Sequence, residues 1–267
     1  MEIFKEPCKP EQIAENKAEE PVKKESRILS GAEIRENLED PNYLPSRKEI
    51  ITAFPRRDDL WKYCTKEENQ VFEFFNEEHL EALADYFIER IKECGKGEDD
   101  PLIILEMGAG NGKLSHFLQQ KLEKKAPGQV KVVATDSGSW EIENVFPVEK
   151  LSCDEALETH KPDIVVFSWM PNGADYTEEM RECPTVKEYV LIGETGGGCC
   201  GNEWETWGCD YDYDEDKGIP PFEKDGFEIE SLEDLHKLQI CRTDYNLRDL
   251  SHSNTVSFKR KKSESAD

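Results

Sequence analysis

A glycine-rich turn between an apolar run and a helical pattern constrains this chain more than any other feature. The apolar run 102–105 is followed by Glu106 and Met107, then by glycines at 108, 110 and 112, and then by a helical pattern over about 113–124. Glycine adopts backbone angles closed to other residues and lets the backbone approach a ligand closely. The segment therefore predicts a buried strand, a ligand-binding loop and a helix in direct succession.

Further apolar runs alternate with helical patterns along the rest of the chain. They lie at 130–135, 163–167 and 189–192, and each is continuous rather than alternating. Continuous apolar strands are covered on both faces, which indicates an α/β fold with a mostly parallel sheet between two layers of helices. Near the end, 227–229 and 255–258 are strand candidates without a clear crossover helix just before the last one. We therefore expect an antiparallel hairpin at one edge of the sheet.

The composition divides the chain into a charged beginning and a folded remainder. Residues 1–42 contain many Glu and Lys, several prolines and few large apolar side chains, so we expect a disordered charged tail. Between 43 and 98 apolar residues recur at helical spacing, with Val71, Phe72 and Phe75 included in the pattern, which predicts a helical lead-in. We expect the folded domain over 43–259 and a basic, polar tail at 260–267.

The chain is strongly acidic, with a formal net charge of −25 over 267 residues. Clustered Lys and Arg are needed to bind phosphate backbones and anionic lipid, so nucleic acid and membrane surfaces are disfavoured as partners. No apolar stretch approaches the ~20 residues of a membrane span, and the first residues lack the apolar core of a secretory signal. We expect a cytoplasmic protein, or a nuclear one if the basic run 259–262 is an address. The oligomeric state is not predicted.

The spacing of the glycines separates three kinds of ligand-binding loop. A dinucleotide-binding loop has the pattern G-x-G-x-x-G, and a phosphate-binding loop has four residues between its glycines and Ser or Thr after its lysine. Here the glycines alternate, Met107 stands where the first phosphate-loop glycine would fall, and Leu114 follows Lys113. Both patterns are disfavoured, and an NAD-dependent enzyme is the weakest of the hypotheses.

An acidic residue followed by G-x-G-x-G resembles motif I of the class I S-adenosylmethionine-dependent methyltransferases. The resemblance implies a Rossmann-like seven-stranded sheet and S-adenosylmethionine as the cofactor, with the loop backbone against its amino-acid and ribose parts. Asp136 ends the second apolar run, where the family places an acidic residue that accepts from the ribose hydroxyls. The implied cofactor-binding residues are Glu106, Gly108, Ala109, Gly110, Asn111, Gly112, Asp136, Ser137, Asp154 and Ser168.

Asp154 has two interpretations. It either accepts a hydrogen bond from the adenine amino group or caps the helix that begins near Glu155.

The segment after the fourth strand, 168–176, faces the transferred methyl group in the resembled family. Amine methyltransferases often carry an Asn/Asp/Ser-Pro-Pro-aromatic motif there. This chain keeps Ser168 and Pro171 but has Trp169 and Met170 between them, a departure that weakens the inference of amine methylation. Trp169 either lines the substrate pocket or packs in the core.

A long insertion after the fifth strand carries Trp204, Trp207 and seven carboxylates between 203 and 216. Ligands of open α/β sheets bind beyond the carboxyl ends of the strands, so we expect this loop on the active side. Aromatic faces among carboxylates suit a cation or an amine, which makes Trp204 and Trp207, with Trp169, the predicted substrate contacts. The alternative is a solvated acidic loop that its tryptophans anchor to the core.

No metal site is predicted in the insertion. Cys199, Cys200 and Cys209 do not have zinc-binding spacing. The alternating aspartates at 210, 212 and 214 lack the glycine and the terminal glutamate of a calcium loop.

The implied reaction is methyl transfer from S-adenosylmethionine by in-line displacement, in which the enzyme holds acceptor and methyl group in line. The acceptor is unknown, a small molecule or a protein, and a cationic amine or a protein side chain is favoured. The candidate catalytic residues are Ser168, Asp175, Tyr176 and Glu194. The alternative is a non-catalytic methyltransferase-like protein that binds a partner through its acidic loop.

Overall fold

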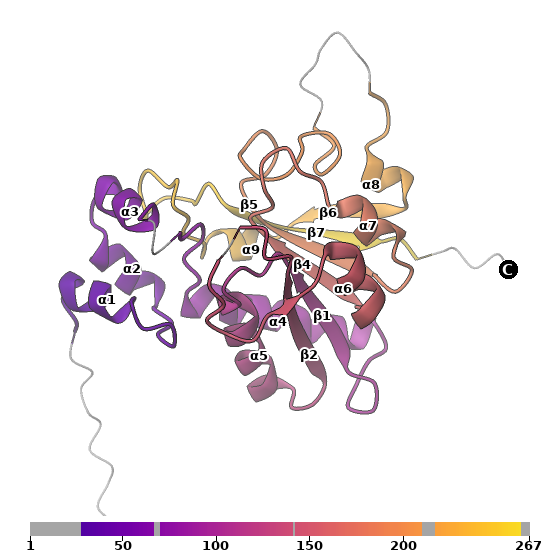
Figure 1. Cartoon of the computed structure of the whole chain (residues 1–267), viewed down its shortest axis with the longest axis horizontal. Helices are drawn as coiled ribbons and strands as arrows, with labels where there is room; N and C mark the ends of the chain where they lie inside the picture. The colour runs from indigo at the N-terminus through magenta and orange to yellow at the C-terminus, as the bar shows by residue number, and fades with distance from the viewer. Residues whose placement is uncertain (1–27, 67–69, 141, 210–216, 263–267) are drawn as a thin grey trace, which may run out of the picture.

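The computed structural model describes residues 28–66, 70–140, 142–209 and 217–262, and its central feature is a seven-stranded sheet (Figure 1). The strands are β1 Leu102–Met107, β2 Val130–Asp136, β3 Glu149–Lys150, β4 Ile164–Ser168, β5 Glu188–Gly193, β6 Phe227–Ser231 and β7 Asn254–Arg260. Their order is β3-β2-β1-β4-β5-β7-β6. The first five strands along the chain are parallel, and β7 runs antiparallel to both β5 and β6. The expected parallel sheet with an antiparallel edge hairpin is confirmed.

The register of the parallel strands brings their carboxyl ends to one edge of the sheet. Met107 at the end of β1 pairs with Thr135 of β2 and with Phe167 of β4, and Ser168 pairs with Ile192. The residues that follow β1, β2 and β4 therefore lie side by side, although up to about sixty residues separate them in the chain.

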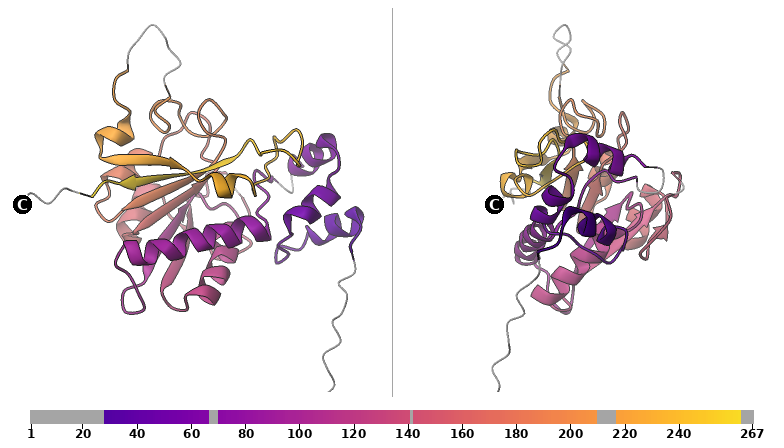
Figure 2. Two further views of the ribbon diagram at one scale, coloured as in Figure 1. Left: turned by 180° about the vertical axis from the view of Figure 1, so that it is seen from behind. Right: turned by 90° about the vertical axis from the view of Figure 1, so that its left-hand side faces the viewer.

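Helices cover both faces of the sheet, as expected for a three-layer sandwich (Figure 2). On one face α4 Glu77–Glu93, α5 Lys113–Lys125 and the short α9 Glu233–His236 share an apolar core with β1, β4 and β5. On the other face lie α6 Cys153–His160, α7 Thr177–Glu182 and α8 Pro221–Lys224. The buried side chains of α4 recur three and four residues apart, from Leu80 to Ile91, so a single stripe faces the sheet.

Three helices that precede the sheet form a third apolar cluster. They are α1 Gly31–Asn37, α2 Arg47–Ala53 and α3 Arg57–Cys64. Ile50 and Leu60 of these helices pack with Phe74, Ile240 and Leu247. The cluster thus joins the beginning of the chain to the segment between β6 and β7.

The beginning of the chain differs from the expected tail. Residues 1–27 lie outside the described residues, but α1 begins at Gly31, well before the expected domain start at 43. Ser30 caps this helix in a capping box with Glu33, and Ile34 is buried beneath it. At the other end β7 continues to Arg260, and 263–267 lie outside the described residues.

The predicted helical pattern through 71–75 is wrong. Helix α4 begins only at Glu77, because the Asn76 side chain accepts a hydrogen bond from the His79 N–H and caps it. The preceding residues are extended: the Phe74 N–H donates to the Ile240 carbonyl, and the Arg242 N–H donates to the Phe72 carbonyl. None of the helices in the described ranges is long and apolar enough to cross a membrane.

Candidate active site

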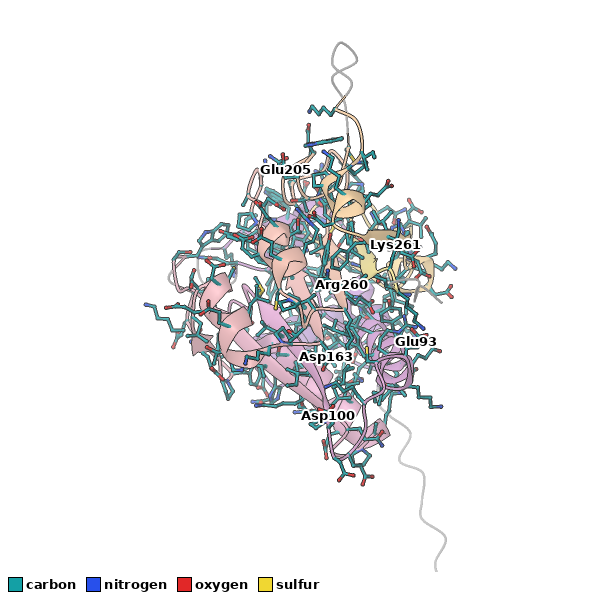
Figure 3. All side chains as sticks on the ribbon, turned by 90° about the vertical axis from the view of Figure 1, so that its right-hand side faces the viewer. Glu93, Asp100, Asp163, Glu205, Arg260 and Lys261 are labelled. Carbon is teal, nitrogen blue, oxygen red and sulfur yellow. The ribbon has the colours of Figure 1, made fainter. Side chains whose placement is uncertain are left out.

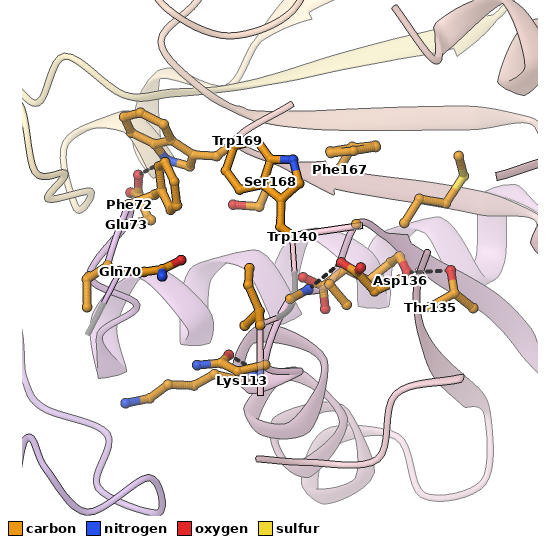
Figure 4. A pocket seen from close by; sticks show the side chains of 18 of the residues that line it. Gln70, Phe72, Glu73, Lys113, Thr135, Asp136, Trp140, Phe167, Ser168 and Trp169 are labelled. Carbon is orange, nitrogen blue, oxygen red and sulfur yellow. Dashed lines mark hydrogen bonds between the residues drawn. The ribbon is translucent and has the colours of Figure 1, made fainter. Parts of the chain in front are cut away.

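A cavity of about 880 Å³ lies at the carboxyl ends of β1, β2 and β4 (Figure 4). One part of its wall is the glycine loop after β1 with the segments that follow β2 and β4. The other part comes from the chain before the sheet, including residues between α1 and α2 and the extended segment before α4. Open α/β sheets bind ligands at this edge, and cavities of roughly 300–1,000 Å³ hold small molecules and cofactors.

The glycine loop needs its glycines for backbone conformation. Gly108, Gly110 and Gly112 have φ angles of +65°, +55° and +78°, in the left-handed region that other residues rarely adopt. At Gly108 a Cβ atom would also lie 2.6 Å from the Phe167 ring. At Gly110 the nearest atom would be 3.5 Å away, so the loop is more open there. Gly108, Ala109, Gly110 and Asn111 line the cavity, whereas Gly112 is the N-cap of α5.

Asp136 connects the glycine loop to the turn after β2. Its Oδ2 accepts from the Gly110 N–H at 2.9 Å, and its Oδ1 accepts from the Gly138 N–H at 2.7 Å. Each carboxylate oxygen has a second lone pair that can accept from a ligand hydroxyl. Asp136 and the neighbouring Ser137 line the cavity, so both lie where the resemblance implies a cofactor contact.

Glu106 lies in β1 just before the glycine loop, and hydrogen bonds join its carboxylate to α5. It is 3% exposed, and its carboxylate accepts from the Ser115 N–H at 3.0 Å and from the Ser115 hydroxyl at 2.5 Å. Gly112 has no side chain to cap α5, so Glu106 satisfies an N–H of the first turn instead. Burial raises the pKa of Glu106 to about 7. Glu106 is one of the residues that line the cavity, but the hydrogen bonds that its carboxylate accepts come from Ser115 of the helix.

The segment after β2 folds against the glycine loop. The N–H groups of Val145 and Phe146 donate to the Asn111 carbonyl at 3.2 and 3.1 Å. The Phe146 ring stacks on His116 of α5, with 3.8 Å between the ring centroids. These contacts bring Trp140, Ile142 and Phe146 to the wall of the cavity.

Asp154 does not cap helix α6, which was one of its two interpretations. Ser152 is the N-cap of α6, and its hydroxyl accepts from the Glu155 N–H. Asp154 lies in the first turn of this helix and lines the cavity. Its predicted contact with adenine stays a prediction.

Trp169 follows β4 in a backbone conformation that is unusual for a tryptophan. Its φ angle is +59°, which costs of order 1 kcal/mol or more in a residue that has a side chain. Its N–H donates to the Ile192 carbonyl at 2.7 Å, and its indole N–H donates to Glu73 Oε2 at 2.9 Å. Both Trp169 and Ser168 line the cavity, and their contacts with substrate and cofactor stay predictions.

The predicted catalytic candidates separate into two groups. Ser168 and Tyr176 line the cavity, and the Tyr176 ring stacks on Phe167 at 5.6 Å. Asp175 instead accepts from the hydroxyls of Thr177 and Thr206.

Glu194, the fourth candidate, accepts from the Cys199 N–H and the Thr243 hydroxyl. Like Asp175, it does not line the cavity.

The structure does not bring Trp204 and Trp207 to the cavity. Trp207 is 7% exposed, and its indole N–H donates to the Cys200 carbonyl at 2.7 Å. The Trp204 ring instead has the Lys217 ammonium 5.6 Å from its centroid. Glu205 belongs to the same loop as Trp204 and Trp207, and Figure 3 shows it well separated from Asp163 at the amino end of β4. The remaining five carboxylates of the insertion lie at 210–216, outside the described residues.

The sequence analysis missed much of the cavity wall, including Phe72, Glu73 and Trp140. Glu73 is 6% exposed and accepts from Trp169 and, at 3.3 Å, from the Gln239 amide. Burial raises its pKa to about 8. A signal was present, because Glu73 is a carboxylate inside the apolar run 71–75, and buried carboxylates are rare unless they have a specific partner.

Across the part of the chain that the structure describes, His, Cys, Asp and Glu side chains do not gather in a group that could hold a metal ion. No family model matches the chain, and no curated protein matches its sequence.

Solved structures resemble the chain in fold. The crystal structure of the DszA carbon methyltransferase has 13% identity and a TM-score of 0.41, and the match covers 80% of this chain and 60% of that one. The magnesium protoporphyrin IX methyltransferase ChlM from Synechocystis PCC 6803, solved with bound SAH, has 12% identity and a TM-score of 0.34 over 68% and 84% of the two chains. An O-methyltransferase family protein from Burkholderia thailandensis has 9% identity and a TM-score of 0.33 over 87% and 70%.

The chain spans about 60% of the length of the DszA enzyme and of two further carbon methyltransferase structures that it matches. The strand order, the five parallel strands and the antiparallel β7 are properties of this chain and do not depend on these matches. The chain therefore has a Rossmann-like α/β fold with a seven-stranded, mostly parallel sheet, the fold that the resemblance in the glycine loop implied.

Proposed function

We propose that the chain is an S-adenosylmethionine-dependent methyltransferase whose cofactor lies on the glycine loop after β1. The observation that carries the proposal is the juxtaposition of Gly110 and Asp136 at the cavity wall. The loop offers backbone at its most open glycine, and the carboxylate beside it keeps lone pairs for a ribose diol.

The charges of the cavity also fit this cofactor. Among the described lining residues, carboxylates outnumber ammonium groups, and Asp136, Asp154 and Glu179 lie on the side of the glycine loop. A negative wall attracts a sulfonium cation and repels the phosphates of a dinucleotide. Lys113 is the cation on this side, and burial lowers its pKa.

When bound, S-adenosylmethionine supplies an electrophilic methyl group. The chain's contribution is to position: Asp136 and the glycine loop hold the nucleoside part, and Ser168 and Trp169 at the end of β4 border the space for the acceptor. Holding two reactants in line converts an encounter in solution into a step within one complex, which is a large part of the catalysis of such transfers.

Methyl transfer from labelled S-adenosylmethionine into a fractionated cell extract tests the activity. The proposal predicts label in one fraction of protein, RNA or small molecules, and the loss of that label with Asp136→Ala. Asp99→Ala is the matched control, because it removes one carboxylate at an exposed turn before the amino end of β1. If the chain binds cofactor but labels no fraction, the non-catalytic alternative replaces the proposal.

A further inference from the structure

The cavity contains a second region beyond the glycine loop, and the chain before the sheet builds it. Its wall includes Leu38, Pro41, Tyr63, Val71, Phe72 and Phe75. Most of the lining side chains from this part of the chain are apolar or aromatic; Glu39, Lys66, Gln70 and Glu73 are the charged and polar ones. A region of this composition has the character of a binding site for an apolar small molecule.

Three aromatic side chains meet where this region approaches the end of β4. The Phe72 ring lies 6.0 Å from Trp140 and 5.6 Å from Trp169, at interplanar angles of 50° and 47° (Figure 4). Because the rings are tilted, they do not cover one another's faces by stacking. Trp140 is 53% exposed although it is large and apolar, so much of its surface has no protein contact. We call Phe72, Trp140 and Trp169 the aromatic wall.

Two members of the aromatic wall are fixed by contacts from elsewhere in the chain. Glu73 holds the Trp169 indole by a hydrogen bond of 2.9 Å, and Gln239 in turn donates to Glu73. The Arg242 guanidinium lies 3.9 Å from the centroid of Phe72, and the Arg242 N–H donates to the Phe72 carbonyl. A wall whose rings are held in advance loses little freedom when a ligand binds.

The position of Arg242 also makes a cationic ligand unfavourable on the aromatic wall. Its guanidinium is 5.6 Å from the Trp169 ring as well as 3.9 Å from Phe72, so the chain's own cation already interacts with both π systems. A second cation on the cavity faces of these rings would be repelled by the Arg242 charge and would compete with it for the same π systems. Glu73, the carboxyl group nearest to the indole, does not offset this repulsion at neutral pH, because burial raises its pKa to about 8.

We propose that the aromatic wall binds a neutral small-molecule acceptor that contains a planar ring, and that Glu73 is a positioning residue that holds Trp169 in place for it. The inference rests on the proposed function and narrows it, because it excludes a cationic amine or a basic protein side chain as the group on these rings. The acceptor's ring lies on the wall, next to the end of β4 and therefore next to the proposed cofactor site.

Calorimetric titration with three matched probes tests the aromatic wall. The probes are 2-naphthol, its saturated analogue decahydro-2-naphthol, and the cationic 2-naphthyltrimethylammonium. We expect 2-naphthol to bind, and each of the other two to bind roughly tenfold more weakly or not at all. The saturated analogue loses the ring contacts, and the cation is repelled by the charge of Arg242. Equal affinities for the three, strongest binding of the cation, or no binding of 2-naphthol would overturn the inference.

Variants assign the binding to the wall. Trp140→Ala should weaken 2-naphthol binding by roughly fivefold or more, and it is a safe substitution because Trp140 is largely exposed. Trp61→Ala is the control, since Trp61 is an exposed tryptophan of α3 that does not line the cavity. Unchanged affinity in Trp140→Ala, or an equal loss in Trp61→Ala, would contradict the assignment.

The role of Glu73 is tested by rescue. Glu73→Leu should weaken 2-naphthol binding while the affinity for S-adenosylhomocysteine stays unchanged, and Glu73→Gln, which can still accept from the indole, should restore it. Loss of both affinities in Glu73→Leu, or no rescue by glutamine, would refute the positioning role. Each probe is titrated with and without S-adenosylhomocysteine. If S-adenosylhomocysteine does not bind, the proposed function is overturned. The titrations of the three probes in its absence still test whether the aromatic wall binds a neutral ring.

Discussion

Replacing Glu73 by glutamine should remove a pH dependence from the stability of the fold. The Glu73 carboxyl group is buried and accepts hydrogen bonds from Trp169 and Gln239. Burial raises its pKa to about 8, because the charged form loses its hydration there. Glutamine has nearly the same size and keeps an oxygen that can accept from the indole, but it does not titrate.

The magnitude follows from the two pKa values. An unfolded glutamate titrates near pH 4.5, so between pH 4.5 and about 8 the folded protein holds a proton that the unfolded chain has released. The stability contributed by the protonated group is complete below pH 4.5 and is lost as the pH rises to about 8. One pKa unit corresponds to about 1.4 kcal/mol, so the whole interval represents up to roughly 5 kcal/mol of unfolding free energy.

Urea unfolding of the wild type and of Glu73→Gln, measured from pH 5 to pH 9, gives the difference directly. Other titrating groups are shared and cancel, so the variant should gain stability relative to the wild type by about 1.4 kcal/mol per pH unit up to about pH 8 and then stop gaining. Glu158→Gln, on the exposed side of α6, should show no such trend. A difference for Glu73→Gln that is flat between pH 5 and 8 would refute the reasoning.

Four further changes test the site and its supports. Glu106→Gln should show the same relative gain in the urea series but stop near pH 7, because burial raises the pKa of Glu106 to about 7; a gain that continues past pH 8 would be inconsistent with that value. Gly108→Ala should lower the unfolding free energy by about 1–3 kcal/mol, since φ is +65° and a Cβ would meet an aromatic ring, and it should weaken nucleoside binding; thermal unfolding and calorimetry that match the wild type would contradict both. Leu83→Ala, at a fully buried site of α4, should cost about 2–5 kcal/mol in urea unfolding and leave nucleoside affinity intact; a parallel loss of affinity would show that α4 shapes the site. Trp207→Phe removes one hydrogen bond to a buried carbonyl and should lower the unfolding free energy by about 1–3 kcal/mol without changing the affinity for 2-naphthol. A weaker affinity for 2-naphthol would indicate that Trp207 contributes to the acceptor site after all.

The sequence predicts the parts of the fold and site that depend on local pattern. Continuous apolar runs predict the buried strands, and the glycine loop predicts the strand–loop–helix unit around Gly110. Asp136 is found because it directly follows such a run. The helix α1 carried a local signal as well, since Ser30 and Glu33 have the spacing of a capping box.

The acceptor side could not be predicted because distant segments build it. Glu73 is buried by residues of the segment before β7, and its partner Gln239 is 166 residues away in the chain. The position of Trp207 also depends on a distant segment. The carboxylates around it favoured a substrate contact, with an anchor in the core as the alternative, and the structure packs it against Phe258 of the last strand in the core. The local composition of the sequence predicts neither the contact of Glu73 with Gln239 nor that of Trp207 with Phe258.

Binding of S-adenosylhomocysteine to the whole chain, followed by calorimetry, tests the central claim most directly. The account predicts saturable binding at one site, weakened at least about tenfold in Asp136→Ala through the loss of charge-assisted hydrogen bonds and unchanged in Asp99→Ala. Absence of binding, or equal affinities in the wild type and Asp136→Ala, would contradict the placement of the cofactor on the glycine loop.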